Sequence, residues 1–203
     1  MAEGRGGLIG GWHMTHSVHT VLAAHHDNRA YFRERVEVTL TQEADGAIAI
    51  SYVINDISSD IRVPTPDTPA PEGSLWQTTC CELFVNPVEQ TGYREFNFSP
   101  SGQWAAHDFL DIRKPAPAAP SCAAPEIKAK REKSRLQLDV KLPKSAFPRA
   151  ASLRLAVNVI LQANDGTLAY WALTHPPGKP DFHHHAGFVL NLGPMGFRPT
   201  RWP

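Results

Sequence analysis

The sequence has no excess of charge of either sign. It contains 20 Lys and Arg residues against 20 Asp and Glu residues, so its formal net charge at pH 7 is zero. Nucleic-acid-binding proteins usually present a basic stripe or face, and the most basic stretch, residues 128–133, is interrupted by Ala129 and Glu132. We therefore expect no nucleic-acid partner.

Cysteine is scarce, and long apolar runs are absent. Cys80, Cys81 and Cys122 form neither a paired disulfide framework nor a C-x-x-C metal motif. Because neighbouring residues of a strand point to opposite faces, we expect Cys80 and Cys81 to be reduced, with at least one of them buried. No stretch reaches the roughly 20 apolar residues of a membrane span, and residues 17–24 are too short for a signal peptide. We expect a cytoplasmic protein with no membrane partner.

The sequence also lacks the period of 3.6 residues that marks amphipathic helices. Val36, Val38 and Leu40 instead alternate with polar residues, and Asp45-Gly46 then marks a hairpin turn. The pattern predicts an all-β fold, an antiparallel β-sandwich of the jelly-roll or immunoglobulin-like kind, with about nine or ten strands. We expect one short helical turn at residues 144–150, a mobile leader at residues 1–15, and a single domain at residues 16–203.

Polar side chains share one face of the strand predicted at residues 93–99. Alternation places Phe96 and Phe98 on the core side of that strand. The opposite side carries a phenol, a carboxylate, an amide and a hydroxyl, from Tyr93, Glu95, Asn97 and Ser99. A sheet face this polar either meets solvent or lines a groove.

The block of residues 76–113 has the composition of a sugar-binding groove. Aromatic rings stack on the C–H face of a pyranose, while carboxylates, amides and guanidinium groups bond to its hydroxyls. The rings and polar groups come from Trp76, Tyr93, Trp104, Glu82, Glu95, Asn97 and Arg113. The same residues also have structural interpretations, the tryptophans as core side chains and Glu95 with Arg113 as a cross-strand ion pair.

Two long motifs carry a family resemblance. The first runs W-x-x-T-C-C-E-L-F-V at residues 76–85, Y-R-E-F-N-F-S-P-S-G-x-W at 93–104 and D-F-x-x-x-R at 108–113. The second, Y-W-A-L-x-H-P-P-G-K-P-D-F-H, occupies residues 170–183 and includes His175. Both resemble DOMON-like proteins, which are similar to the family 9 carbohydrate-binding modules.

The resemblance implies a sandwich of two antiparallel sheets whose concave face binds a sugar or, in other branches, haem. It also implies that Trp76 and Glu82 contact the ligand. We therefore predict a non-catalytic module that binds a small carbohydrate or related polyhydroxylated ligand. The predicted ligand-binding residues are Trp76, Glu82, Tyr93, Glu95, Asn97, Trp104, Arg113 and His175.

An enzymatic alternative uses some of the same carboxylates. A glycoside hydrolase would pair Glu82 with Glu95 or Asp108, because the reaction needs two carboxyl groups about 5 to 10 Å apart. The sequence has no G-x-S-x-G elbow, P-loop or G-x-G-x-x-G motif. A second enzymatic alternative, a thiol hydrolase built from His175, Asp181 and a cysteine, is weaker because Cys81 is expected in the core.

Cofactor, metal and partner-binding alternatives depend on the histidines and tryptophans. Haem would need an axial ligand such as His107, and a metal would need several of residues 181–185 to converge. We expect neither a cofactor nor a metal. A partner-binding sandwich without a small ligand is favoured if Trp76 and Trp104 are both fully buried.

Overall fold

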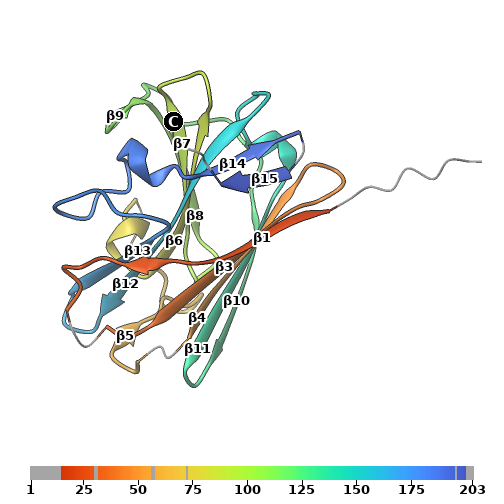
Figure 1. Cartoon of the computed structure of the whole chain (residues 1–203). Helices are drawn as coiled ribbons and strands as arrows, with labels where there is room; N and C mark the ends of the chain where they lie inside the picture. The colour runs from red at the N-terminus through yellow and green to blue at the C-terminus, as the bar shows by residue number, and fades with distance from the viewer. Residues whose placement is uncertain (1–14, 30–31, 56–57, 72, 195, 200–203) are drawn as a thin grey trace, which may run out of the picture.

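The structure is a computed structural model that describes residues 15–29, 32–55, 58–71, 73–194 and 196–199. The predicted leader at residues 1–15 lies outside the described residues except for its last position. The described chain forms two antiparallel β-sheets that pack face to face (Figure 1). The all-β sandwich predicted from the alternation is confirmed.

The first sheet holds five strands in the order β1-β3-β4-β11-β10. β3 and β4 pair in continuous register from Arg35 with Asn55 to Gln42 with Ile48, across the predicted Asp45-Gly46 turn. In this turn the backbone of Gly46 has a φ of 82°, which a residue without a Cβ adopts readily. The strands are β1 (His16–Val21), β3 (Arg35–Gln42), β4 (Ile48–Asn55), β11 (Arg135–Leu142) and β10 (Glu126–Glu132).

The second sheet is built around β12 (Leu153–Ala163), which pairs with β6 along most of its length. The main path is β15-β14-β12-β6-β7-β8-β9, with β13, β2 and β5 attached beside it. The longer strands are β6 (Cys80–Pro87), β7 (Tyr93–Phe98), β8 (Trp104–Asp111), β13 (Leu168–Ala172), β14 (Leu190–Gly193) and β15 (Gly196–Pro199). The two-residue strands are β2 (Ala23–Ala24), β5 (Ile61–Arg62) and β9 (Lys114–Pro115).

The hydrophobic core lies between the two sheets, where alternate residues of each strand face inward. Phe96 and Phe98 are fully buried there, as predicted, and so is Leu83; all three pack in one cluster with apolar residues of the first sheet. The phenol of Tyr52 on β4 crosses this core and donates a hydrogen bond to the backbone oxygen of Glu82, 2.9 Å away. One strand of the second sheet is therefore tied to the first sheet by a polar contact as well as by packing.

The described residues also include three short 3₁₀ turns: η1 (Leu75–Gln77), η2 (Lys144–Ala146) and η3 (His185–Gly187). The helical turn expected at residues 144–150 is present as η2 and is shorter than expected. The last two strands of the described chain, β14 and β15, form a short antiparallel pair. None of the helices in the described part of the chain has the length and apolar character needed to cross a membrane.

Candidate functional site

The outer face of the second sheet carries the polar residues that alternation had grouped together. Glu95 on β7 pairs in register with Phe84 of β6 and His107 of β8, so all three side chains stand on this face. Two connections cover part of the face. The loop before β6 brings η1 over it, and the segment after β13 crosses it. There Phe188 packs against Phe84, and Phe182 packs against the cluster that these two residues form.

A cavity of about 470 Å³ is left between the sheet and these two connections, and we call it the sheet pocket. Its size falls within the roughly 300–1,000 Å³ typical of small-molecule sites. Its floor comes from β6, β7, β8 and β12, and its walls come from η1, the β8–β9 turn, β13 and the segment at residues 180–183. The lining residues are Gly73, Trp76, Glu82, Phe84, Glu95, His107, Phe109, Arg113, Pro115, Ile160, Tyr170, Pro180, Phe182 and His183.

Trp76 is exposed at the wall of the pocket because its neighbour anchors the turn that carries it. Leu75 is buried against Ala70 and Cys80, and the hydroxyl of Thr78 closes the turn by donating to the backbone oxygen of Leu75 at 2.8 Å. With Leu75 held inward, the indole of Trp76 is left 50% exposed, unlike the buried Trp171. An exposed indole beside a cavity provides a flat apolar surface for a ligand.

Glu82 lies at the floor of the pocket and is only 2% exposed. No hydrogen bond or ion pair to its carboxyl group is found among the described residues. Burial and the neighbouring carboxyl of Glu95 raise the pKa of Glu82 well above its ordinary value. Glu82 therefore holds its proton over a wider pH range than an exposed glutamate and offers both a donor and an acceptor to the cavity.

Glu95 is 6% exposed and is partly satisfied by the protein. The side-chain amide of Asn97 donates to its Oε1 at 2.6 Å, and its Oε2 lies 3.8 Å from Nε2 of His183. Burial raises the pKa of Glu95, and the hydrogen bond from Asn97 works in the opposite direction. Asn97 is itself buried behind the pocket and does not line it, so its role is to orient Glu95.

Tyr93 positions the segment that closes the pocket. Its ring stacks between Phe84 and Phe109, and its hydroxyl lies 2.6 Å from Nδ1 of His183. The backbone N–H of Arg113 donates to the same hydroxyl at 3.2 Å. When the phenol donates to Nδ1, the hydrogen of the neutral His183 ring is on Nε2, the nitrogen that lies 3.8 Å from Glu95.

Burial lowers the pKa of His183 to about 4, so its imidazole is neutral at neutral pH. Its contact with Glu95 is then no ion pair. Arg113, at the turn between β8 and β9, adopts a φ of 52° and directs its guanidinium to Asp181 at 2.8 Å. The cross-strand ion pair between Glu95 and Arg113, considered above as a structural alternative, is replaced by this pair with Asp181.

The structure brings together four of the eight predicted ligand-binding residues. Trp76, Glu82, Glu95 and Arg113 line the sheet pocket, while Tyr93 and Asn97 support it from behind. The other two lie elsewhere, for separate reasons.

Trp104 pairs in register with Phe98 and packs against the core on the inner face, opposite the pocket. His175 donates from Nε2 to the backbone oxygen of Ala23 at 2.9 Å and does not line the pocket. Asp108, one of the two possible hydrolase partners of Glu82, also lies on the inner face, where Arg94 binds both of its oxygens.

Several lining residues were not predicted. Tyr170, Phe182 and His183 come from the second long motif, and His107 comes from β8. Alternation could have placed His107, because it shares the outer face of β8 with Phe109. The three late residues depend on how the segment after β13 crosses the sheet, which no local pattern encodes.

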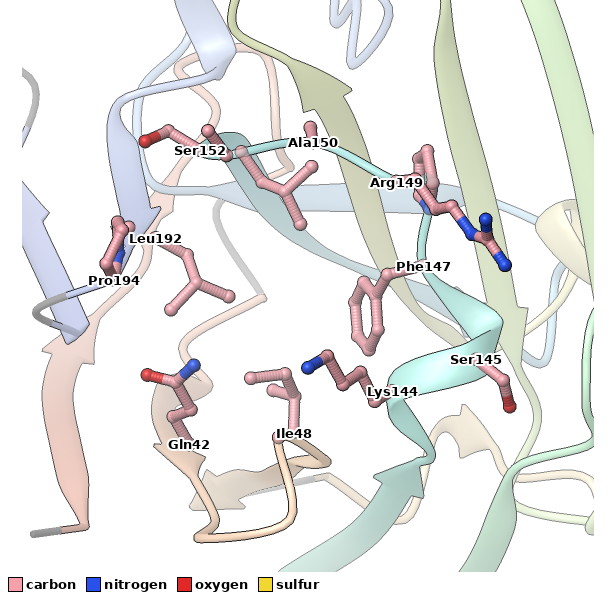
Figure 2. Close-up of a pocket in the computed structure, with 15 residues that line it drawn as sticks. Gln42, Ile48, Lys144, Ser145, Phe147, Arg149, Ala150, Ser152, Leu192 and Pro194 are labelled. Atoms are coloured by element: carbon pink, nitrogen blue, oxygen red, sulfur yellow. The ribbon is translucent and has the colours of Figure 1, made fainter. Parts of the chain in front are cut away.

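A second, larger cavity of about 850 Å³ lies at one end of the sandwich (Figure 2). Its floor is apolar, with Ile48, Leu153 and Leu192 contributed by both sheets. Figure 2 shows Lys144 extending into this cavity and Arg149 directed away from it. Both charged side chains are exposed, so the cavity has no buried polar group that would fix the orientation of a ligand.

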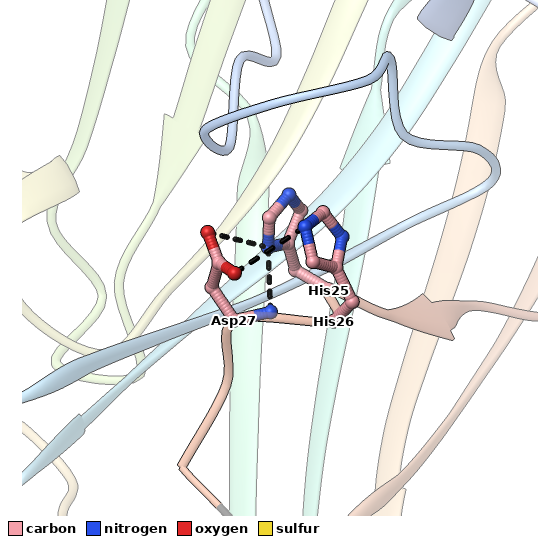
Figure 3. A group of neighbouring side chains, drawn as sticks. All are labelled: His25, His26 and Asp27. Carbon is pink, nitrogen blue, oxygen red and sulfur yellow. Dashed lines mark hydrogen bonds and ion pairs between the residues drawn. The ribbon is translucent and has the colours of Figure 1, made fainter.

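His25, His26 and Asp27 form the one group of potential metal ligands found in the described residues (Figure 3). Their candidate ligand atoms lie within 4.8 Å of one another. Nδ1 of His25, however, already accepts the backbone N–H of Asp27 at 3.1 Å. A metal at this nitrogen would have to displace that bond, which makes the group a poor metal site.

Comparison with known proteins identifies a shared fold. No family model matches the chain, and no curated protein matches it in sequence. Among solved structures, a proposed carbohydrate-binding protein from Bacteroides uniformis superposes with a TM-score of 0.59 at 14% identity, covering 84% of each chain. Two further matches are structures of a family 9 carbohydrate-binding module from Caldicellulosiruptor kristjanssonii.

The glucose complex of that module has a TM-score of 0.51 at 9% identity, covering 74% of this chain and 72% of the module. The cellotriose complex has a TM-score of 0.50 at 10% identity, covering 74% of this chain and 70% of the module. These similarities establish that the chain has the fold of the family 9 modules. The DOMON-like part of the sequence resemblance stays a resemblance.

Proposed function

We propose that this chain binds a small carbohydrate in the sheet pocket. The observation that carries the proposal is the presence in one cavity of an exposed indole, Trp76, and two buried carboxyl groups, Glu82 and Glu95. The indole offers a surface for the C–H face of a sugar ring, and the carboxyl groups offer hydrogen bonds to its hydroxyls. The fold shared with sugar-bound modules supports the same proposal.

The exposure of Trp76 also bears on the partner-binding alternative. That alternative is favoured by two buried tryptophans, and Trp76 is half exposed. An apolar ring that is held over a cavity by a buried neighbour, Leu75, is positioned for a ligand of small size. A flat protein–protein contact would not need the two carboxyl groups beneath it.

Each part of a bound sugar has a matching group in the sheet pocket. The ring of a sugar lies against Trp76, and its hydroxyl groups reach Glu82 and Glu95 on the floor. His183 adds an N–H donor from Nε2, and Arg113 closes one wall through its ion pair with Asp181. Because Asn97 and Tyr93 hold Glu95 and His183 in place, the polar groups are oriented before a ligand arrives.

Calorimetric titration with glucose and cellotriose tests the proposal. We expect saturable binding to the unaltered protein and a loss of about tenfold or more in affinity in the Trp76→Ala variant. Val21→Ala, which shortens an exposed apolar side chain on β1, is the matched control and should bind as the unaltered protein does. Binding that survives Trp76→Ala unchanged would contradict the proposed site.

The same preparation distinguishes binding from hydrolysis. Of the two predicted carboxylate pairs, the structure leaves Glu82 with Glu95 on one face of the sheet. Incubation with aryl glycosides should release no phenol if the pocket only binds. Release that stops in the Glu82→Gln variant would assign the pair to hydrolysis instead.

A further inference from the structure

The floor of the sheet pocket has more acidic character than a neutral sugar requires. Glu82 is almost completely buried, lines the cavity, and receives no hydrogen bond or ion pair on its carboxyl group from the described residues. A buried carboxyl group without a partner is costly to the fold. Such a group in a cavity indicates that the missing partner comes from the ligand.

Glu95 adds a second carboxyl group that is only half satisfied. Asn97 donates to one of its oxygens, and the other lies 3.8 Å from His183, beyond hydrogen-bonding distance. The neutral ring of His183 supplies no charge at neutral pH. The two carboxyl groups of the floor therefore have one close donor between them.

The cations near the floor act on Glu95 and not on Glu82: His107 and Arg113 lower the pKa of Glu95, and neither shifts the pKa of Glu82. The guanidinium of Arg113 is bound to Asp181 at 2.8 Å, and the imidazole of His107 is exposed at the rim. The other titratable groups around Glu82, none of which is cationic, are Cys80, Cys81, Tyr52 and Tyr170. No described cationic side chain is placed to neutralise Glu82.

The walls suit a cation as well as a sugar ring. Trp76, Tyr170, Phe109 and Phe182 surround the cavity, and aromatic faces attract a positive charge within about 6 Å. A hydroxyl group donates one hydrogen bond, whereas an ammonium group donates three. The ammonium group also carries the positive charge that no described side chain supplies to Glu82. Hydrogen bonds between charged groups are also the stronger kind.

We propose that the sheet pocket selects sugars that carry a protonated amine, such as a 2-amino-2-deoxyhexose, over the matching neutral sugars. This inference rests on the proposed function, since it assigns a sugar class to the same site. The ammonium group lies between Glu82 and Glu95, and the sugar ring lies against Trp76. Glu82 gives up its proton to solvent as the ammonium group binds, so that the carboxylate and the ammonium form an ion pair.

Parallel titrations with glucosamine, glucose and N-acetylglucosamine test the inference at about pH 6, where a primary amine is protonated. We expect glucosamine to bind about tenfold or more tightly than either neutral sugar. Glucose that binds as tightly as glucosamine would overturn the inference and leave the proposed function intact. Failure of all three sugars to bind would overturn both.

Two variants and one further ligand sharpen the test. Glu82→Gln should lower glucosamine affinity about tenfold and so remove its preference over glucose, because Gln keeps the shape of a protonated carboxyl group but cannot become a carboxylate. Glu89→Gln, at an exposed position after β6, should change neither affinity. Ethanolamine, an amine without a sugar ring, should not bind measurably, and tight binding of ethanolamine would overturn the sugar class.

Proton release gives a readout that does not depend on affinity. Titrations in buffers of different ionisation enthalpy should show up to one proton released per glucosamine bound and none per glucose. The release should disappear in Glu82→Gln. Equal proton release for glucosamine in the unaltered protein and in Glu82→Gln would overturn the role assigned to Glu82.

Discussion

The hydroxyl of Tyr93 lies 2.6 Å from Nδ1 of His183, and this contact joins the second sheet to the segment that closes the sheet pocket. The two residues are 90 positions apart in the chain. The imidazole also packs edge-on against Phe84 and Phe109. Burial, together with the charge of Arg113, lowers the pKa of His183 to about 4, so the fold favours its neutral ring.

The lowered pKa of His183 predicts a pH-dependent stability. The unfolded chain takes up a proton on this side chain near its ordinary pKa of 6.5, while the folded chain does so only near 4. The stabilisation is therefore complete above about pH 6.5 and is lost as the pH falls towards about 4. We expect a loss of about 2 kcal/mol over this window, after allowance for solvent screening.

Chemical denaturation between about pH 4 and pH 7 measures this effect. His183→Gln should flatten the slope of stability against pH in that window, because Gln does not titrate. Val21→Ala, which changes an exposed side chain on β1 that does not titrate, should leave the slope as it is in the unaltered protein. An unchanged slope in His183→Gln would contradict the assignment.

The bond from Tyr52 to the backbone of Glu82 predicts a link between the core and the site. Tyr52 is fully buried, and its phenol donates at 2.9 Å to the backbone oxygen of the residue that lines the pocket floor. Tyr52→Phe should lower the free energy of unfolding by about 1 to 2 kcal/mol. Urea denaturation measures the loss, and Tyr170→Phe provides the same chemical change at a hydroxyl with no hydrogen bond found in the described residues.

A polar clamp at one end of the sandwich predicts a larger loss. Arg94 binds both oxygens of Asp108, at 2.7 and 2.8 Å, and donates to the backbone oxygen of Ala146 at 2.7 Å. The hydrogen bond and charge of Asp108 raise the pKa of Arg94 further. Arg94→Ala should lower the free energy of unfolding by about 2 to 3 kcal/mol, because a fork of charged hydrogen bonds is lost.

The matched control for this clamp is Arg35→Ala. Arg35 also pairs with a carboxylate, Glu37, but its side chain is 60% exposed. Exposed pairs contribute little, so we expect a change of about 0.5 kcal/mol or less. Equal losses in the two variants, measured by thermal denaturation, would show that the contacts of Arg94 add nothing to those of a surface pair.

The fold was predictable from the sequence because period-two alternation marks an inner and an outer face directly. Alternation assigned Phe96 and Phe98 to the core and Glu95 to the opposite face, whereas Glu82 was added through the family resemblance. Trp104 was predicted to bind the ligand, but it packs against the core. Alternation gives the two faces of β8, but the register with Phe98 is what places the Trp104 side chain on the inner one.

The walls of the site were less predictable because they come from connections. The left-handed backbone of Arg113 turns its guanidinium towards Asp181, a residue 68 positions later in the chain. His183 reaches Tyr93 only after the segment beyond β13 has crossed the sheet. Contacts of this kind depend on the path of a loop through space, which residue propensities do not specify.

The buried carboxyl of Glu82 predicts that the site lowers the stability of the fold. Its pKa is raised well above the ordinary value of 4.5, chiefly by burial. A raised pKa means that the folded chain holds a proton that the unfolded chain releases above about pH 4.5, so the stability falls as the pH rises from that point.

Glu82→Gln keeps the shape of the protonated group without this loss of stability. We expect the variant to be more stable than the unaltered protein at pH 7 to 8, by about 1 to 3 kcal/mol or several degrees in Tm. Thermal denaturation followed by circular dichroism should show the gain shrinking towards zero near about pH 4, where the carboxyl is protonated in both states. Glu89→Gln, at its exposed position, should show no gain at either pH. A gain in stability for Glu82→Gln that is the same at every pH would mean that Glu82 lowers the stability through its packing and not through its protonation.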